Sequence, residues 1–503
     1  MNEAMLERRL ADERATVLLG QDIAAALRHG DVLALQGDLG AGKTTLARGL
    51  IRALAADPVL EVPSPTFTLV QGYDARIPVQ HFDLYRLSSV DELYELGFEE
   101  AGRHGIAIVE WPEKAGRHLP AGTISIELSH EGEERHARIT GSQAAVARIE
   151  RSFLARHFLA QAGWGNADRA YFAGDASARS YETVTVADKA ERILMNSPRL
   201  ILGPPVRDGK PYAEIAHTAQ TVTAFVAIAR MLREGGVAVP EVLEQDLERG
   251  FLLIENLGTG SFLDRAGRPV EERYRAAGEL LAAMHAKSWP DTVEAAPGFV
   301  HRIPPFDRDA MMIEVELLLD WYVPAIFGNP ASPELRAAFR TAWHAVFDFL
   351  EDKERGFVHR DFQSPNIIWR ADRKGHDRLG IVDFQDGLIG PAAYDVASIA
   401  LDARVTISAE LERAVIDAYI AAREKLAPFD RNRFDEAYAI LAAQRNSKIL
   451  GIFVRLDRRD GKPDYLRHLP RIRDYLRRVM THPSLSRLRA LYEETGFLEE
   501  RPL

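Results

Sequence analysis

The sequence contains no cysteine, which excludes disulfide bonds, thiolate catalysis and zinc or iron–sulfur sites held by cysteine. It also lacks an apolar run approaching the roughly 20 residues needed to cross a bilayer. Residues 1–20 alternate charged and apolar side chains, unlike a signal peptide. We therefore expect a cytoplasmic protein with no membrane partner.

Basic residues are scarce in the first quarter of the chain. Residues 1–140 hold 22 acidic and 14 basic residues, so −8 of the formal net charge of −11 falls there. Contacts to a nucleic-acid backbone need clustered Lys and Arg. We therefore expect no strong direct nucleic-acid binding, and any role in RNA chemistry would be indirect.

The length of 503 residues exceeds the roughly 250–300 at which a single core stops growing, so at least two domains are expected. Residues 31–140 alternate apolar runs with helical stretches, which is typical of an α/β fold. An amphipathic helix (146–162) leads into a strand-rich stretch, 169–198. From Pro269 the chain is mostly helical, with one strand pair around 358–384.

These patterns predict an α/β domain followed by a bilobal α+β domain, the layout of a P-loop NTPase joined to a protein-kinase-like phosphotransferase. The predicted bounds are 1–145 for the first domain and 146–503 for the second, with a small lobe at about 165–257 and a helical large lobe at about 258–503.

A phosphate-binding loop stands between an apolar strand and a helix. Gly37 to Thr44 reads Gly-Asp-Leu-Gly-Ala-Gly-Lys-Thr, which satisfies G-x-x-x-x-G-K-[ST] in the required context. Its N–H groups can wrap phosphates, Lys43 can neutralise their charge, and the Thr44 hydroxyl can bind Mg²⁺. We predict ATP contacts from Gly37, Asp38, Leu39, Gly40, Ala41, Gly42, Lys43, Thr44 and Thr45.

Magnesium needs a second acidic ligand at the end of a neighbouring strand. Asp83 and Glu110 both qualify, and Glu110 ends the better buried-strand pattern. The residues alone leave this choice open.

The phosphate loop, together with Ser64–Phe67, His81–Leu87 and Val109–Glu113, resembles the TsaE family over about residues 10–135. That family contributes an ATPase to bacterial tRNA threonylcarbamoyladenosine synthesis, where it resets the TsaB–TsaD complex rather than modifying tRNA itself. The resemblance implies Thr44 and Glu110 on Mg²⁺, catalytic Asp83 near the γ-phosphate or attacking water, Trp111 beside the nucleotide, and Ser64–Phe67 as a switch-like loop.

A second catalytic centre is indicated further along the chain. His359 to Asn366 matches H-x-D-x-x-x-x-N, and a strand ending at Asp383 follows 17 residues after Asn366. Asp361 can accept the proton of a substrate hydroxyl, while Asn366 and Asp383 can hold Mg²⁺. The sequence thus predicts an ATP-dependent kinase.

One part of a kinase site is absent. Met195 stands where protein kinases place a phosphate-binding lysine, and Arg179, Lys189 or Arg192 are candidates to replace its charge. Residues 174–181 occupy the place of the phosphate-covering loop, so we predict nucleotide contacts from Ser177 and Arg179. Residues 250–258 fit the hinge between the lobes.

Several segments resemble aminoglycoside-phosphotransferase-like kinases, and most of all the AmgK group. They are Gly174–Tyr181, Ile193–Pro198, His359–Asn366, Val382–Asp386 and Gly390–Asp395, with further similarity over about 150–480. The resemblance implies anomeric phosphorylation of the amino sugars N-acetylmuramate and N-acetylglucosamine during cell-wall recycling, with ATP and Mg²⁺.

Alternatives remain. The second half could phosphorylate another small alcohol, of the aminoglycoside, choline or homoserine type, or be a regulatory pseudokinase, and the first half could only sense ATP for the kinase. The sugar pocket is poorly encoded: its candidates are Glu316, Trp321, Tyr322, Arg445 and Asn446. Asp395 is expected to brace the catalytic segments.

Overall fold

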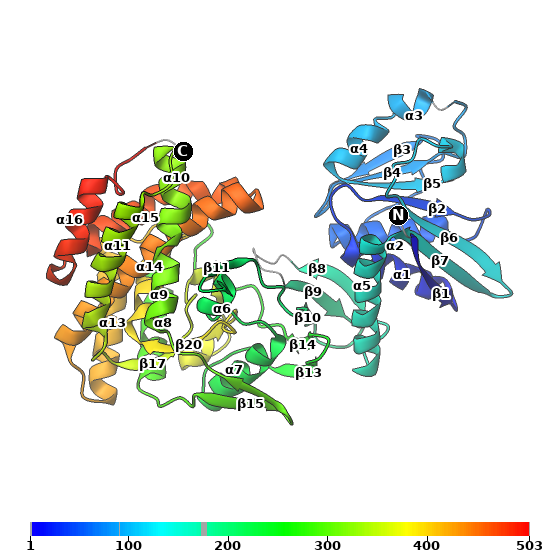
Figure 1. The fold of residues 1–503 in the computed structure, drawn as a ribbon. Coiled ribbons are helices and arrows are strands. Elements are labelled where there is room, and N and C mark those ends of the chain that lie inside the picture. The colour runs from blue at the N-terminus through cyan, green and yellow to red at the C-terminus, as the bar shows by residue number, and fades with distance from the viewer. Residues whose placement is uncertain (1–2, 90, 173–178, 502–503) are drawn as a thin grey trace. The chain divides into compact units, whose positions relative to one another are not determined.

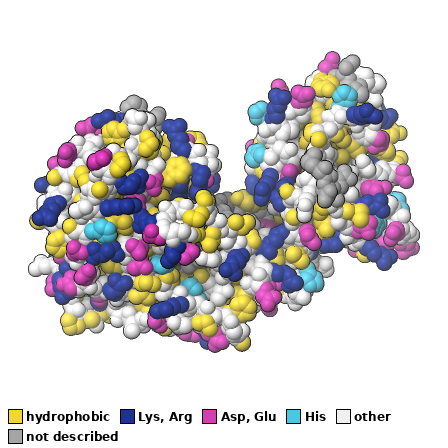
Figure 2. Space-filling view, viewed as in Figure 1, with side chains coloured by type: hydrophobic (Ala, Val, Ile, Leu, Met, Phe, Trp, Pro, Cys, Tyr) yellow, Lys and Arg dark blue, Asp and Glu magenta, His cyan; other side chains and the backbone are white. Residues whose placement is uncertain are grey.

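The computed structural model describes residues 3–89, 91–172 and 179–501 (Figure 1). The chain forms two compact units, Met1–Pro198 with Leu243–Asn256 and Arg199–Val242 with Leu257–Leu503. Charged side chains of both signs are interspersed on the face shown in Figure 2. Among the residues that the structure describes, none of the helices combines the length and the apolar character needed to span a membrane.

The first unit contains a seven-stranded sheet. In spatial order its strands are β1 (Glu3–Leu10), β7 (Glu134–Ser142), β6 (Ile124–Glu131), β2 (Val32–Gln36), β5 (Ile106–Glu110), β4 (Val79–Asp83) and β3 (Val70–Tyr73). The four central strands β6, β2, β5 and β4 run parallel. Strands β2 and β5 are almost continuously apolar because both faces of the sheet are covered.

Helices α1 (Glu13–Ala26) and α2 (Lys43–Ala55) contribute to the core on one face of this sheet. On the other face lies a smaller core that includes residues of α3 (Asp91–Glu95) and α4 (Phe98–His104). This arrangement leaves the carboxyl ends of β2, β4 and β5 at one edge of the sheet, where ligands bind in open α/β folds.

A second, antiparallel sheet belongs to the same compact unit. In spatial order its strands are β13 (Val242–Asp246), β14 (Phe251–Glu255), β10 (Arg192–Asn196), β9 (Ser180–Thr185) and β8 (Asp168–Phe172). Helix α5 (Gln143–Gln161) begins at Ser142, whose hydroxyl accepts from Ala145 N, and lies between the two sheets (Figure 1). It packs on α1 and on β14, so it contributes to both cores.

A buried ion-pair cluster joins α1 to the edge strand β8. Arg169 on β8 donates to Asp22 on α1 at 2.7 Å, and its guanidinium also bonds Glu182 at 2.7 and 2.9 Å. Arg156 on α5 donates to Asp22 at 2.9 Å. The cluster crosses the domain boundary predicted at 145/146, which therefore falls inside one compact unit.

The second unit is mainly helical. Its main helices are α7 (Val222–Glu234), α8 (Glu271–His285), α9 (Arg308–Val315), α11 (Pro333–Phe347), α12 (Ala393–Ala400), α13 (Ala409–Leu426), α14 (Arg431–Asp460), α15 (Leu469–Val479) and α16 (Ser486–Thr495). Shorter helices are α6 (Tyr212–Ile215) and α10 (Val323–Phe327). Helix α14 is buried without interruption from Ala437 to Gly451, because α9, α12 and α15 pack around it.

Short antiparallel strand pairs interrupt the helices. They are β11 (Pro205–Arg207) with β12 (Lys210–Pro211), β15 (Thr292–Ala296) with β16 (Phe299–Arg302), β17 (Arg355–Val358) with β20 (Leu388–Pro391), and β18 (Ile367–Trp369) with β19 (Leu379–Ile381). The β18–β19 pair lies within the region 358–384, where one strand pair was predicted, whereas β17–β20 is an additional pair that extends beyond it. The β15–β16 hairpin was not predicted, since that stretch was read as helical.

Candidate active sites

The phosphate loop joins the end of β2 to the start of α2. Gly37, Gly40 and Gly42 have φ values of 138°, 85° and 104°, which residues with a Cβ atom rarely adopt. Lys43 Nζ donates to the carbonyl oxygens of Gly37 at 2.7 Å and Asp38 at 2.9 Å. These bonds hold the ammonium group over the loop, where a phosphate oxygen would meet it.

Lys43 also lies against an aromatic ring. Its Nζ is 3.8 Å from the centre of the Trp111 ring, and Trp111 in turn packs against Tyr85 at 5.0 Å. Burial lowers the pKa of Lys43, while surrounding carboxylates, Glu110 first, oppose that shift. The charged amine is therefore less favoured here than in water, and the carboxylates offset only part of the cost of its burial.

The two predicted oxygen ligands for Mg²⁺, Thr44 and Glu110, meet at the start of α2. Thr44 Oγ1 lies 3.0 and 3.1 Å from the two carboxylate oxygens of Glu110. The buried ring of His81 holds the same carboxylate, with Nε2 at 3.0 Å from Oε1. A hydroxyl and a carboxylate at this separation suit Mg²⁺, which binds hard oxygen atoms.

Asp83 ends the strand next to Glu110, and the two residues are register partners in β4 and β5. Its Oδ2 accepts hydrogen bonds from the hydroxyls of Ser64 at 2.6 Å and Thr66 at 2.7 Å. The Tyr85 amide donates to Oδ1 at 3.0 Å. The structure thus brings the loop at Ser64–Phe67 together with the acidic strand ends, although 16 residues separate Asp83 from Phe67 in the sequence.

The second site lies in the loops that follow β17 and β19. Asn366 Nδ2 donates to the carbonyl oxygen of Asp361 at 2.9 Å, and Val382 N donates to the carbonyl oxygen of Asn366 at 3.0 Å. Asp383 has a φ of 62°, and its Oδ1 accepts from Gln385 Nε2 at 2.8 Å. These bonds tie the two segments together, so the predicted metal ligands Asn366 and Asp383 lie in adjoining loops.

Asp395 braces these segments, as expected. Its carboxylate accepts from the amides of His359 at 2.6 Å and Arg360 at 3.0 Å, and it is fully buried. Burial raises the pKa of Asp395 to about 7, although the two amides act in the opposite direction. His359 bonds the carbonyl oxygen of Val382 through Nε2 at 3.0 Å.

A buried charge cluster next to Asp361 was not predicted from the sequence. Arg360, which directly precedes Asp361, has a φ of 79° and pairs with the fully buried Glu314 of α9. Lys448 Nζ is 2.7 Å from the same carboxylate, and Gln444 Nε2 donates to it at 3.0 Å. Burial would raise the pKa of Glu314, but Lys448 and Arg360 lower it to about 2.

The residues expected to line the sugar pocket include several that are engaged with other parts of the second unit. Tyr322 is a core residue whose hydroxyl bonds the carbonyl oxygen of Phe497 at 3.1 Å, and Glu316 pairs with Arg207 and Arg340. Arg445, another of the sugar-pocket candidates, lies on α14 near Lys448. The two residues are only 2% and 7% exposed, so neither lies on a solvated face of the helix.

The small-lobe candidates belong to the first compact unit. Met195 lies buried in β10 between its register partners Tyr181 and Leu252. Lys189 bonds the carbonyl oxygen of Gly163 at 3.3 Å and lies over Trp164. Arg179 directly precedes β9 and makes contacts of its own, while Ser177 lies outside the described residues. The replacement for the missing lysine stays a prediction.

Comparisons with known proteins agree with both halves. The family model of the threonylcarbamoyl adenosine biosynthesis protein TsaE matches residues 10–139, and that of the phosphotransferase enzyme family matches residues 168–429. An N-acetylmuramate/N-acetylglucosamine kinase of Caulobacter vibrioides is 32% identical over 368 residues, which are 70% of this chain and 98% of that protein.

Two further similarities cover parts of the chain. A tRNA threonylcarbamoyladenosine biosynthesis protein TsaE of Rickettsia felis is 38% identical over 137 residues, 26% of this chain and 79% of that protein. The solved structure of an ethanolamine kinase of Plasmodium vivax is 13% identical, with a TM-score of 0.42, and covers 70% of this chain and 90% of that one.

The fold and the two sites define a P-loop ATPase joined to a kinase-like phosphotransferase that uses ATP. The chain belongs to the phosphotransferase enzyme family and, over its N-terminal part, to the TsaE family. Both resemblances predicted from the sequence are confirmed.

Proposed function

We propose that the second half phosphorylates N-acetylmuramate and N-acetylglucosamine on the anomeric oxygen. The arrangement of Asp361, Asn366 and Asp383 supports this most directly, in a chain that spans 98% of a relative named for these two sugars. Asp361 accepts the proton of the attacking hydroxyl, which makes its oxygen a better nucleophile. Ser177 and Arg179 are proposed to contact the nucleotide from the small lobe.

The metal requirement follows from the same geometry. Mg²⁺ held by Asn366 and Asp383 would neutralise charge on the transferred phosphate, which is the main demand of phosphoryl transfer. Asn366 and Asp383 are joined through the backbone of Val382, and the Asp395 bonds keep His359 and Arg360 in place. These residues therefore hold the base and the metal ligands in a fixed relation.

The first half is proposed to hydrolyse ATP in support of a TsaB–TsaD-type complex that modifies tRNA. Residues 37–45 wrap the phosphates, Thr44 and Glu110 hold Mg²⁺, Asp83 orients the attacking water, and Trp111 lies beside the nucleotide. The bonds from Ser64 and Thr66 to Asp83 support this role, because they connect the switch-like loop to the proposed catalytic carboxylate. We also propose a cytoplasmic location, and that residues 1–145 carry the ATPase and residues 146–503 the kinase, although the start of the kinase segment packs within the first compact unit.

Phosphorus NMR of the reaction product tests the kinase assignment. The purified full chain is incubated with ATP, Mg²⁺ and each amino sugar, with Asp361→Asn as the inactive control. An anomeric phosphate should form from both sugars and be absent with the control. Turnover of aminoglycosides or choline, with none on either sugar, would favour another small-alcohol kinase, and no transfer to any acceptor would favour the pseudokinase.

A further inference from the structure

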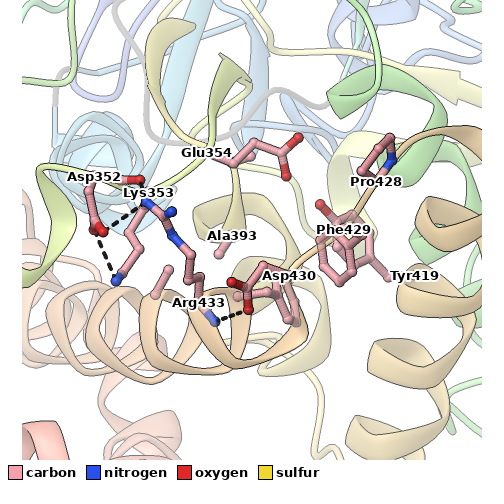
Figure 3. Close-up of a pocket in the computed structure, with 12 residues that line it drawn as sticks. Asp352, Lys353, Glu354, Ala393, Tyr419, Pro428, Phe429, Asp430 and Arg433 are labelled. Atoms are coloured by element: carbon pink, nitrogen blue, oxygen red, sulfur yellow. Dashed lines mark hydrogen bonds and ion pairs between the residues drawn. The ribbon is translucent and has the colours of Figure 1, made fainter.

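The cavity shown in Figure 3 lies in the second compact unit and has a volume of about 320 Å³. Its cations already have partners: Lys353 pairs with Asp352 at 3.1 Å and with Glu436 at 2.7 Å, and Arg433 pairs with Asp352 at 2.8 Å. These charges stabilise one another, so none of them is left to attract a ligand.

His81 in the first unit is a buried polar residue that does serve a predicted site. Side chains alternate between the two faces of a strand, so Val79, His81 and Asp83 point to one face of β4 and Phe82 to the other. Val79 belongs to the core that includes residues of α2, and Phe82 to the smaller core on the opposite face. The fully buried ring of His81 therefore lies on the side of the sheet that carries the phosphate loop.

The imidazole ring makes one hydrogen bond within the part of the chain that the structure describes. Its Nε2 is 3.0 Å from Oε1 of Glu110. An ionised carboxylate only accepts hydrogen bonds, so Nε2 carries the proton and donates. The other ring nitrogen, Nδ1, is buried and has no hydrogen-bond partner among residues 3–89, 91–172 and 179–501. Burying a polar ring is unfavourable unless its groups are bonded, so the bond to Glu110 is what holds this ring in place.

The same bond restrains the predicted metal ligand. Glu110 and Asp83 are register partners at the ends of neighbouring strands, where like charges repel. The Thr44 hydroxyl also bonds the Glu110 carboxylate, at 3.0 and 3.1 Å, but Thr44 is itself a predicted ligand of Mg²⁺. His81 is therefore a donor to Glu110 that does not belong to the predicted metal ligands. Groups that hold a metal ligand in this way typically change metal affinity about 10- to 100-fold when they are removed.

We propose that His81 is a positioning residue of the ATPase site. Its Nε2–H orients the Glu110 carboxylate for Mg²⁺ and so determines how much Mg²⁺ strengthens the binding of ATP. The inference rests on the proposed ATPase function of the first half. A role limited to core packing would change the stability of the first unit, but not the ratio of the ATP affinities with and without Mg²⁺.

The variants His81→Gln and His81→Asn separate these two roles. The amide nitrogen of glutamine reaches about as far along the side chain as Nε2 of histidine, whereas that of asparagine reaches only as far as Nδ1. Only His81→Gln therefore keeps a donor near Glu110. Both side chains are polar and smaller than histidine, so any cost of replacing the buried ring falls on both variants.

Calorimetry of the full chain gives Kd for ATP in Mg²⁺ and in EDTA. An Asp383→Asn background removes a predicted metal ligand of the kinase site, and the binding event that Lys43→Ala abolishes is the N-terminal one. His81→Asn should reduce the gain in ATP affinity caused by Mg²⁺ about tenfold or more, with Kd in EDTA unchanged. His81→Gln should keep this gain within about threefold of its original value, because a hydrogen bond to the carboxylate remains.

His136→Asn is the matched control. His136 lies on β7 of the same sheet, and its Nε2 is 3.9 Å from a carboxylate oxygen of Glu7, which is not a predicted metal ligand. This variant should leave the Mg²⁺-dependent gain unchanged. Thermal melting in EDTA records the stability of each variant separately from its metal dependence.

Three outcomes would overturn the inference. His81→Asn could keep the full Mg²⁺-dependent gain, or His81→Gln could lose as much of it as His81→Asn. Nitrogen NMR of the unaltered chain needs no substitution: it should show the His81 proton on Nε2, and a proton on Nδ1 would contradict the assignment. If the unaltered chain binds ATP at the N-terminal site no more tightly in Mg²⁺ than in EDTA, the proposed ATPase function fails and this inference falls with it.

Discussion

Removing the Asp22 carboxylate tests whether the ATPase domain and the small-lobe sheet share one core. Asp22 on α1 accepts hydrogen bonds from Arg169 on β8 and from Arg156 on α5. The side chains of Asp22 and Arg169 are 7% and 1% exposed, and Glu182 also pairs with Arg169. Asp22→Ala therefore leaves two buried guanidinium groups beside a single carboxylate.

The expected loss of stability is large for one substitution. Removing one partner of a buried ion pair typically costs about 3–5 kcal/mol, because the remaining charge is buried without compensation. For a unit of this size roughly 2–4 °C is lost per kcal/mol, so the melting midpoint of the first unit should fall by about 6–20 °C. Arg14→Ala should cost only about 0–1 kcal/mol, because ion pairs between exposed side chains contribute little.

Arg14→Ala is a matched control because Arg14 also pairs across the predicted domain boundary, with Asp168 at 2.8 Å, but with 43% and 47% of the two side chains exposed. Thermal melting of the full chain gives the midpoint, and hydrogen exchange resolves α1 and β8 separately. Asp22→Ala should reduce protection in both elements. If it loosens α1 alone and leaves β8 and β9 protected, the two domains do not share a core.

The active sites give three further predictions. Glu110→Gln should weaken Mg²⁺-dependent ATP binding at the N-terminal site by about tenfold or more. Calorimetry in an Asp383→Asn background measures this affinity, and ATP binding in the presence of EDTA should be unchanged. Arg360→Gly should be more stable in urea than Arg360→Ala by about 1 kcal/mol, because glycine accepts a positive φ without strain and both variants lose the Glu314 pair. Since burial raises the pKa of Asp395 to about 7, this carboxylate gains a proton as the pH falls through 7 and binds the His359 and Arg360 amides less well. The kinase kcat should therefore fall below pH 7. Asp395→Asn should have a lower kcat that does not fall further as the pH drops below 7. If kcat of Asp395→Asn falls below pH 7 as in the unaltered chain, another group causes the pH dependence.

Both catalytic centres could be predicted because their functional groups lie in short stretches of chain. Gly37–Thr44 and His359–Asn366 carry fixed spacings, and each spacing sets a short stretch of backbone that can hold a phosphate or present metal ligands. The ends of neighbouring strands then bring in Glu110 and Asp383. In such cases local sequence determines local geometry.

Glu314 and the Arg169 cluster could not be predicted in the same way. Glu314 is 46 residues from Arg360, and Asp22 is 147 residues from Arg169, so no local spacing connects the partners. A charged residue on a helix is normally solvated, and the sequence does not show that α14 is surrounded on all sides. The boundary at 145/146 followed the strand pattern, which carries no information on which surfaces later pack together.

The central claim, that one chain carries two separate ATP-dependent activities, is tested most directly by measuring both in the same preparations. ATP hydrolysis without sugar and sugar-phosphate formation are recorded for the unaltered chain, Lys43→Ala and Asp361→Asn. Lys43→Ala should lose sugar-independent hydrolysis by orders of magnitude and keep the kinase. Asp361→Asn should keep hydrolysis and lose about 10²- to 10⁴-fold in sugar phosphorylation. Loss of both activities in either well-folded variant, or sugar phosphate formed at full rate by Asp361→Asn, would contradict the account.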